Sequence, residues 1–432
     1  MARNSDSEKL DVHYKVMVSA GNLAVGMYVC ELDRPWLESP FRFQGFMLLS
    51  EDDVLAVREL CDYVYIDTRK TVRQRRGLAL RSGGIGLRDR ISRLVGAAGS
   101  AQATSVAPDP VAFEDEFQHA QSTYRHSSQL VKTFMEDIRF GRGIDITLAK
   151  EAVSDCVNSI CRNSDAMLLL TQLKRRDEYT SQHSMNVCIF SIAFGRHLGL
   201  PVPVLRNLGL CGLLHDMGKM RVPLEILNKP GRFTEEEFAV MKAHTVYGRE
   251  ILASCRDILP SAVDVAHAHH ERIDGQGYPR ALNRTQTSPI TKMVSVVDAY
   301  DAITSDRVYQ KGRAHLDAIG ILNKAAGSQF DSELVSQFID CLGIYPAGSL
   351  VEMSNGEVAL VVDVNPRQKL RPKVLMLLDA KKRPQTPRIV DLADVDADDE
   401  DHSYRIAVSL PNTAFGLNVR SLYEQGLLAN LK

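Results

Sequence analysis

The pattern of hydrophobic and polar residues changes twice along the chain. Near the N-terminus, short apolar runs such as VMVSAGNLAVGMYVCEL and YVYIDT are rich in Val, Tyr and Ile and are interrupted by Gly, which predicts short strands. Between them, LLSEDDVLAVRELC has the spacing of an amphipathic helix, with Ser50 as its N-cap. Residues 1–72 are therefore predicted to form a small β-rich module.

A long helical segment follows. Residues 73–110 combine a basic run with the stretch AAGSAQATSVAPDP, a composition typical of a flexible linker. From Val111 to about Ile344, apolar runs with helical period recur, for example SMNVCIFSIAFGRHLGL and PITKMVSVVDAYDAI, and Pro- and Gly-containing turns separate them. Residues 111–345 are predicted to form an all-helical domain.

Strand signals return near the C-terminus. In GSLVEMSNGEVALVVDVN the pair Asn355–Gly356 lies between two apolar runs, which predicts a hairpin, and KVLMLLD predicts a further strand. The acidic stretch Asp391–Asp401 is predicted to be an exposed loop. Residues 346–432 are thus a β-rich C-terminal region, and the fold class expected for the chain is mainly α, with small β-rich parts on both sides of the helical domain.

Composition and charge exclude several classes of protein. The net charge of −2 lacks the basic excess of proteins that bind a DNA or RNA duplex. No apolar run reaches the roughly 18 residues of a membrane span, and the first residues do not resemble a secretory signal. The eight cysteines occur singly, as small buried hydrophobes do in a reducing compartment. We therefore expect a cytoplasmic protein without a membrane segment.

Histidines are concentrated in the helical domain. The stretch AHAHHERIDGQGYP holds three of them within four residues, and seven of the twelve in the chain lie between His183 and His270. Taken alone, a histidine on an apolar helix is most often a hydrogen-bonded structural residue. We interpret the following histidines in this way: His13, His119, His126, His197, His267, His315 and His402.

Five separate segments place the remaining histidines and two carboxylates among apolar residues. A buried carboxylate needs a partner, and a divalent cation can satisfy several such groups at once. Imidazole and carboxylate together suit iron, manganese, nickel, cobalt or zinc, and the ligand set alone does not choose among them. Iron or manganese is the expected pair of candidates. Five imidazoles and two carboxylates exceed the needs of one tetrahedral ion and fit two ions that share a carboxylate. The candidate ligands are His183, His215, Asp216, His244, His269, His270 and Asp298.

Two ions roughly 3.5–4 Å apart activate water at neutral pH and hold a phosphate oxygen, which suits phosphoester hydrolysis. Asp216 is the natural bridge, and Lys219, three residues later, is placed to assist the phosphate or the leaving oxygen. The adjacent pair His269 and His270 would lie about 100° apart on a helix, so both can reach one ion only near a helix end. The helix is therefore expected to end within a few residues of His270.

These segments match a known pattern. HD followed by GK at residues 215–219, and HHExxDGxGYP at residues 269–279, resemble the HD-GYP family, a branch of the helical HD superfamily that hydrolyses cyclic di-GMP. The resemblance covers roughly Thr171 to Ile344, and residues 1–72 resemble the small domain that often precedes HD-GYP. It implies a metal-dependent phosphodiesterase that forms pGpG, with further cleavage to GMP left open.

The resemblance also implies roles for single residues. Lys219 corresponds to a substrate-side lysine, Asp301 to a residue that orients a ligand or a guanine base, and Arg307 to an arginine that contacts the nucleotide. One metal site would use His183, His215, Asp216 and Asp298. The other would use His244, His269 and His270, with Asp216 bridging the two.

Two positions depart from the family pattern. Some members hold a third ion with a glutamate one helical turn before the first histidine, where this chain has Tyr179, with Glu178 before it. Two ions are therefore expected rather than three. Gln310 stands where a second substrate-side cation often occurs, which affects substrate affinity or geometry and not the hydrolytic centre.

An alternative function is a cyclic di-GMP sensor with little or no hydrolysis, which would report ligand binding to a partner through the GYP loop. Loss of a metal ligand would favour this alternative, and none of the seven is missing. Another HD-type nucleotidase is disfavoured by the complete GYP segment. Cyclic di-GMP is the expected ligand, while a homodimer and a protein partner at the GYP loop or the N-terminal module are left open.

Overall fold

The computed structural model describes most of the helical and C-terminal parts of the chain and a smaller share of the N-terminal module. The described residues are 15–20, 23, 27–33, 45–48, 51–61, 63–67, 111–172, 179–305, 312–364, 370–394, 405–410 and 414–417. They divide into two compact units, Met1–Gly84 and Ile85–Lys432. The predicted linker, the cap residue Ser50 and most of the acidic loop lie outside the described residues. The domain limits at 72, 110 and 345 stay predictions.

The first unit is a small antiparallel sheet with one helix. Its strands have the spatial order β1-β4-β2-β3, and the predicted helix is confirmed as α1. Val54 and Val57 of this helix are fully buried together with Val29 and Val64 of the sheet, so the apolar face of the helix and one face of the sheet form the core. The bounds are β1 Lys15–Ser19, β2 Tyr28–Leu32, β3 Phe46–Met47, α1 Glu51–Leu60 and β4 Tyr63–Asp67.

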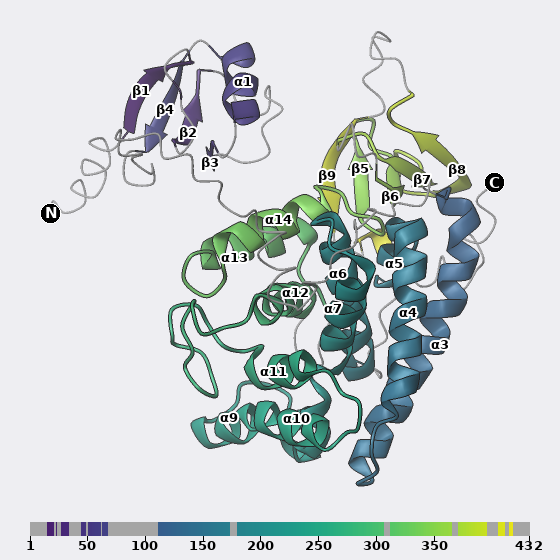
Figure 1. The fold of residues 1–432 in the computed structure, drawn as a ribbon. Helices are drawn as coiled ribbons and strands as arrows, with labels where there is room; N and C mark the ends of the chain where they lie inside the picture. Colours follow the sequence, from purple (N-terminus) through teal and green to yellow (C-terminus); the bar gives the residue numbers. More distant parts are fainter. Residues whose placement is uncertain are drawn as a thin grey trace, which may run out of the picture. The chain divides into compact units, whose positions relative to one another are not determined.

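The second unit is mainly helical, which confirms the predicted fold class (Figure 1). Its central helix is α6, in which every residue from Ser181 to Gly195 is buried. None of the described helices combines the length and the apolar character that a membrane span needs. The helices are α3 Phe113–Arg139, α4 Ile146–Arg162, α5 Ser164–Leu170, α6 Tyr179–His197, α7 Val202–Leu214, η4 Met217–Arg221, α8 Leu224–Leu227, α9 Glu235–Lys242, α10 His244–Ala253, α11 Pro260–Ala268, α12 Pro289–Thr304, α13 His315–Ala325 and α14 Ser332–Leu342.

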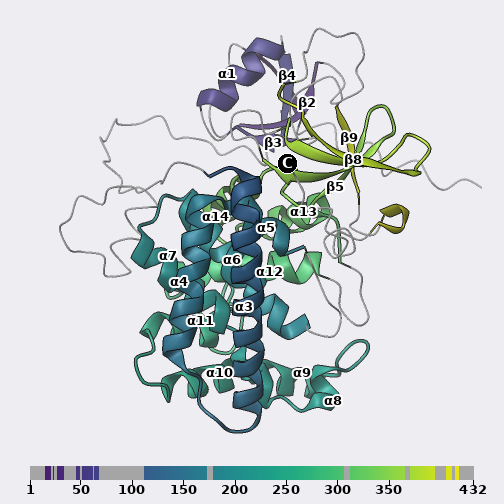
Figure 2. The same cartoon turned by 90° about the vertical axis from the view of Figure 1, so that its right-hand side faces the viewer.

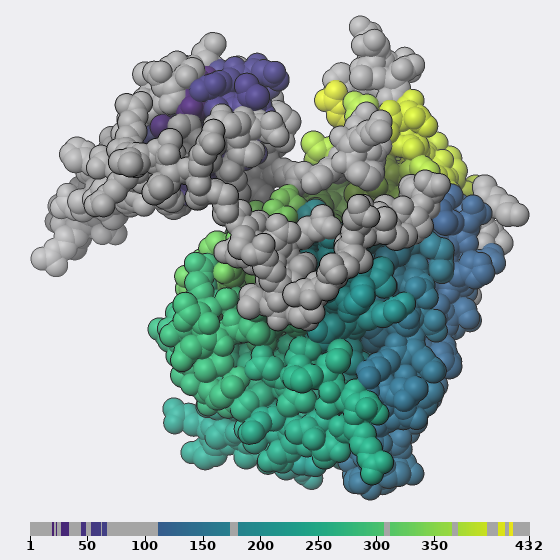
Figure 3. Space-filling model, viewed as in Figure 1, coloured from purple at the N-terminus to yellow at the C-terminus, as the bar shows by residue number. Residues whose placement is uncertain are grey.

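Helix α3 runs along one side of this unit and covers its core. Together with α4 it forms the blue side of the surface in Figure 3. Its apolar residues recur with helical spacing, so one face is buried and the other is polar. At its N-terminal end the buried Glu116 accepts hydrogen bonds from Arg162 Nη2 at 2.8 Å and Ser159 Oγ at 2.7 Å, which fixes α3 to α4. α3 also packs against α6 and η4, and its last residue, Arg139, contacts Met220 of η4.

The C-terminal strands form one antiparallel sheet with the order β8-β7-β6-β5-β9. The predicted hairpin is confirmed, because Asn355 and Gly356 lie in the turn between β5 and β6. Leu360 of β6 is buried in the core shared with the helices, whereas Val361 faces a second apolar cluster on the other face of the sheet. The bounds are β5 Leu350–Met353, β6 Val358–Asp363, β7 Lys373–Leu378, β8 Pro384–Asp391 and β9 Ile406–Leu410.

Candidate metal centre

The candidate ligands come together at helix ends and on two buried helices. α7 ends at Leu214 and is capped by His215, α10 begins at His244, and α11 ends at Ala268 with His269 as its cap. The prediction that the helix terminates beside the histidine pair is therefore confirmed. The other two segments contribute from within helices, His183 from α6 and Asp298 from α12.

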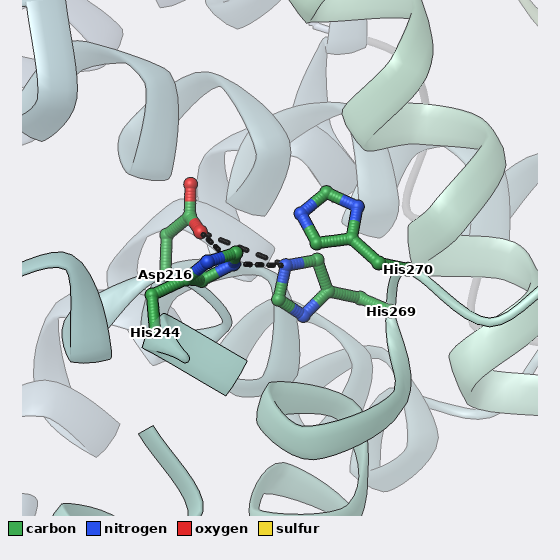
Figure 4. Close-up of side chains that lie close together, drawn as sticks. All are labelled: Asp216, His244, His269 and His270. Carbon is green, nitrogen blue, oxygen red and sulfur yellow. Dashed lines mark hydrogen bonds and ion pairs between the residues drawn. The ribbon is translucent and has the colours of Figure 1, made fainter. Parts of the chain in front are cut away.

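The seven side chains form two neighbouring clusters that meet at Asp216. Its Oδ1 atom lies 3.4 Å from Nε2 of His244 and 3.6 Å from Nε2 of His269 (Figure 4). Its Oδ2 atom lies 3.5 Å from Nε2 of His183 and 3.3 Å from Nε2 of His215. In each cluster the possible ligand atoms lie within 4.8 Å of one another. The clusters are Asp216, His244, His269 and His270, and His183, His215 and Asp298.

Hydrogen bonds on the outer side of the imidazole rings determine which nitrogen carries the proton. Each of four rings has its Nδ1 atom next to an oxygen that can only accept, so Nδ1–H donates and the neutral ring has a bare lone pair on Nε2. All four Nε2 atoms are directed into the clusters. The pairs are His183 to Asp301 Oδ2 at 2.7 Å, His215 to Gly212 O at 2.7 Å, His244 to Met241 O at 2.7 Å, and His269 to Val265 O at 3.0 Å.

Inside the two clusters, the imidazole and carboxylate atoms that face one another are hydrogen-bond acceptors, and no hydrogen-bond donor lies between them. Among the described residues, the buried atoms Nε2 of His215 and Oδ1 of Asp216 have no hydrogen-bond partner. The Nε2 atoms of His244 and His269 are 3.4 Å apart, and in these tautomers no proton lies between them. Burial lowers the pKa of His244 to about 3, so its ring is neutral near pH 7. Converging lone pairs of imidazole and carboxylate are the donor set of transition-metal ions, so these residues fit such ions.

Lys219 belongs to the same centre. Its ammonium group contacts Oδ2 of Asp216, and Lys219 lies in η4, which begins directly after Asp216. Burial is the largest single influence on the pKa of Asp216 and would raise it, but the charge of Lys219 and the contacts with His215 and His183 together hold the pKa well below its usual value. Gly218 allows η4 to lie against α10, because a side-chain carbon there would overlap the backbone of His244 and Gly248. The glycine thus brings Asp216 and His244 together.

Asp301 lies on the side of the His183 ring that faces away from the two clusters. It is fully buried, and besides His183 it accepts hydrogen bonds from Asn186 Nδ2 at 3.0 Å and Ser305 Oγ at 3.1 Å. Its carboxylate faces the outer nitrogen of His183 and does not line the cleft described below. This position favours the orientation of a ligand over contact with a guanine base. The other positions for which the resemblance implies substrate or third-ion roles, Glu178, Arg307 and Gln310, lie outside the described residues.

Histidines interpreted as structural lie away from the clusters. His315 is buried, its Nδ1 lies 2.8 Å from the Tyr300 hydroxyl, and its Nε2 lies 3.0 Å from the Gly343 carbonyl oxygen. His267 is half-buried and belongs to neither cluster. His119, His126 and His197 are exposed, and His13 and His402 lie outside the described residues.

The GYP loop is held by a residue that the sequence analysis missed. Glu271 is buried, and its carboxylate accepts hydrogen bonds from the backbone N–H groups of Arg280 at 2.7 Å and Leu282 at 2.9 Å. Gly277 crosses this segment so closely that a side-chain carbon would lie 2.5 Å from Cα of Glu271. The ring of Tyr278 lies 4.8 Å from the ring of His270. The motif glutamate therefore shapes the loop beside the candidate ligand His270.

A cleft of about 910 Å³ borders the two clusters, and residues of both clusters line it. The GYP loop, α12 and the segment around α9 form part of its wall. A further part of the wall comes from the C-terminal end of α3, whose residues Glu136 and Arg139 line the cleft. The sequence analysis did not predict that α3 lines the cleft, because charged residues at these positions are typical of the solvent-exposed face of an amphipathic helix.

Comparison with known proteins agrees with this geometry. Residues 166–334 match the HD domain, residues 15–149 match a domain of unknown function (DUF3391), and residues 350–396 match a KOW domain associated with the HD domain. The chain is 39% identical to the cyclic di-GMP phosphodiesterase PA4108 of Pseudomonas aeruginosa, over 86% of this chain and 87% of that protein.

Two further relatives match over the helical part. A cyclic di-GMP phosphodiesterase of Thermotoga maritima is 34% identical over 38% of this chain and 45% of its own length. The 3'3'-cGAMP-specific phosphodiesterase 3 of Vibrio cholerae is 31% identical over 40% of this chain and 37% of its own length. The helical fold and the paired His/Asp clusters define an HD-domain phosphohydrolase. Within that class, the chain belongs to the HD-GYP family of phosphodiesterases.

Proposed function

We propose that this enzyme hydrolyses cyclic di-GMP to the linear dinucleotide pGpG, and that it uses two divalent ions, iron or manganese, held by the two clusters. The observation that carries the proposal is the shared carboxylate of Asp216, whose two oxygens face different clusters. The names of the relatives support the choice of substrate. The cleft volume of about 910 Å³ lies in the range typical of sites for small ligands.

Bound ions of this kind activate water and hold phosphate oxygens at neutral pH. The protein residues prepare the site for that chemistry. Asp216, His244 and His269 direct only lone pairs into the site. The two histidines carry their protons on Nδ1, where they donate to backbone carbonyl oxygens, and the carboxylate of Asp216 is ionised. Lys219 is partly exposed at the edge of the centre, where its ammonium group can hold a phosphate oxygen and donate a proton to the leaving 3'-oxygen. Glu271 keeps the GYP loop in place beside the substrate.

The test compares the unaltered protein with Asp216→Ala. Protein purified without chelator is supplied with manganese or ferrous iron and incubated with cyclic di-GMP, and the products are separated. We expect pGpG from the unaltered protein, none from Asp216→Ala, and a lower metal content in the variant. Asp155→Ala, an exposed carboxylate on α4, is the matched control and should behave as the unaltered protein. Metal and cyclic di-GMP bound without any product would instead favour the sensor function, whereas absence of metal would contradict the proposal.

A further inference from the structure

We propose that Glu136 and Arg139 of α3 form a guanine-recognition site in the cleft and select guanine over adenine in the cyclic dinucleotide. This inference rests on the proposed function, because it names the part of the substrate that the wall formed by α3 recognises. Both residues line the same cleft as Lys219 and several of the candidate ligands. They lie outside residues 166–334, which match the HD domain.

The geometry of α3 places the two side chains side by side. Residues three apart on a helix share a face, with roughly 5–6 Å between their Cβ atoms, which is close to the width of a purine edge. Arg139 is held at the cleft wall, where its Nη2 atom lies 3.7 Å from the sulfur of Met220, the residue after Lys219. Figures 1 and 2 show the C-terminal end of α3 reaching the level of α10.

The charges of this pair are available for a ligand. Within the described part of the chain, neither Glu136 nor Arg139 has an ion-pair partner, and the sulfur of Met220 does not neutralise the guanidinium group. The neighbouring Asp137, which does not line the cleft, is paired with Arg142 at 2.8 Å. Asp137 and Arg142 thus neutralise each other, whereas Glu136 and Arg139 face the cleft without an ion-pair partner among the described residues.

The chemistry of the pair is complementary to guanine. A carboxylate accepts from N1–H and the 2-amino group of guanine, and a guanidinium donates to O6 and N7. Adenine has an amino group in place of O6 and a lone pair at N1. The guanidinium donor of Arg139 would therefore face the amino donor of adenine, and the carboxylate acceptor of Glu136 would face the N1 acceptor. Met135 and Met220 are largely buried but also line the cleft, so the wall beside the pair is apolar, as suits the face of a base. A phosphate would suit Arg139 but would be repelled by Glu136.

The test uses Glu136→Gln and Arg139→Ala, with Arg142→Ala as the matched control. We measure kcat/KM for cyclic di-GMP, cyclic di-AMP and the base-free substrate bis(p-nitrophenyl) phosphate, and dissociation constants for both cyclic dinucleotides by calorimetry. Each variant should lower kcat/KM for cyclic di-GMP by about 10- to 100-fold, mainly through KM, and reduce its preference over cyclic di-AMP. Turnover of the base-free substrate should not change, and Arg142→Ala should match the unaltered protein throughout.

Two results would overturn the inference: no loss with cyclic di-GMP, or an equal loss with cyclic di-AMP, which would indicate phosphate binding. Because both side chains are exposed, the variants are expected to fold, and thermal denaturation checks this. If the unaltered protein does not cleave cyclic di-GMP, the proposed function fails separately. The dissociation constants then decide the inference, because the variants must still weaken binding of cyclic di-GMP more than binding of cyclic di-AMP.

Discussion

Replacement of Gly218 by alanine tests whether the close approach of η4 to α10 assembles the metal centre. A side-chain carbon at this position would lie 2.9 Å from Cα of Gly248 and closer still to the backbone oxygen of His244. Carbon atoms in contact are normally about 3.5–4.0 Å apart, so α10 would have to withdraw by more than about 0.6 Å. Both clashing groups are backbone and cannot turn aside. The displacement would therefore move His244 away from Asp216, which now lies 3.4 Å from it.

We expect Gly218→Ala to lose about 2–3 kcal/mol of stability, the upper part of the range for overpacked sites. A displacement of about 1 Å in a catalytic site costs roughly 100-fold in rate, so a loss of that order is expected in kcat/KM for cyclic di-GMP. Thermal denaturation, metal analysis and the product assay measure these effects. Gly320→Ala in α13, where no atom lies within 4 Å of the added carbon, should be neutral or slightly stabilising. A Gly218→Ala protein with unchanged melting temperature and metal content would refute the reasoning.

Three further predictions concern the centre and the fold around it. Asp301→Asn should weaken metal binding or activity by about 10- to 100-fold, because it removes the charge that orients His183; an unchanged metal titration would contradict this. Chelation of the metal should lower the melting temperature, since the lone pairs of His215 and Asp216 lose their cation, and an equal melting temperature would argue against bound ions. Burial lowers the pKa of His315 to about 4, so the unfolded chain takes up a proton between pH 6.5 and 4 that the folded chain does not. Stability should therefore fall as the pH drops through this range, less steeply in His315→Gln, and urea denaturation with equal pH slopes for both proteins would contradict this.

Local patterns were sufficient to predict most of the described elements and the residues that form the two clusters. The helical period marks one buried face, and the Asn355–Gly356 pair specifies a turn, so both could be read without tertiary information. The candidate ligands stood out because they interrupt apolar runs, as His215 and Asp216 do after Leu214. Each signal lies within a few residues of the feature that it predicts.

Features that depend on packing between distant segments could not be predicted in this way. Asp298 and Asp301 are one turn apart, yet they meet opposite nitrogens of the His183 ring, a difference that the spacing does not contain. Arg139 reaches Met220, 81 positions away, only because α3 packs against η4. In sequence it is an ordinary charge on a polar helix face. Such roles appear only when the tertiary contacts are known.

The region that matches the HD domain is shorter than the folded unit to which it belongs, because α3 lies outside the match but inside the fold. The HD match begins at residue 166, but α3 and α4 precede it and supply buried residues such as Phe117 and Phe134 to the same core. A chain that began at residue 166 would expose the apolar side of α6 and open the cleft on the side of Arg139. A fragment that is to keep this core and the whole wall of the cleft therefore has to include α3.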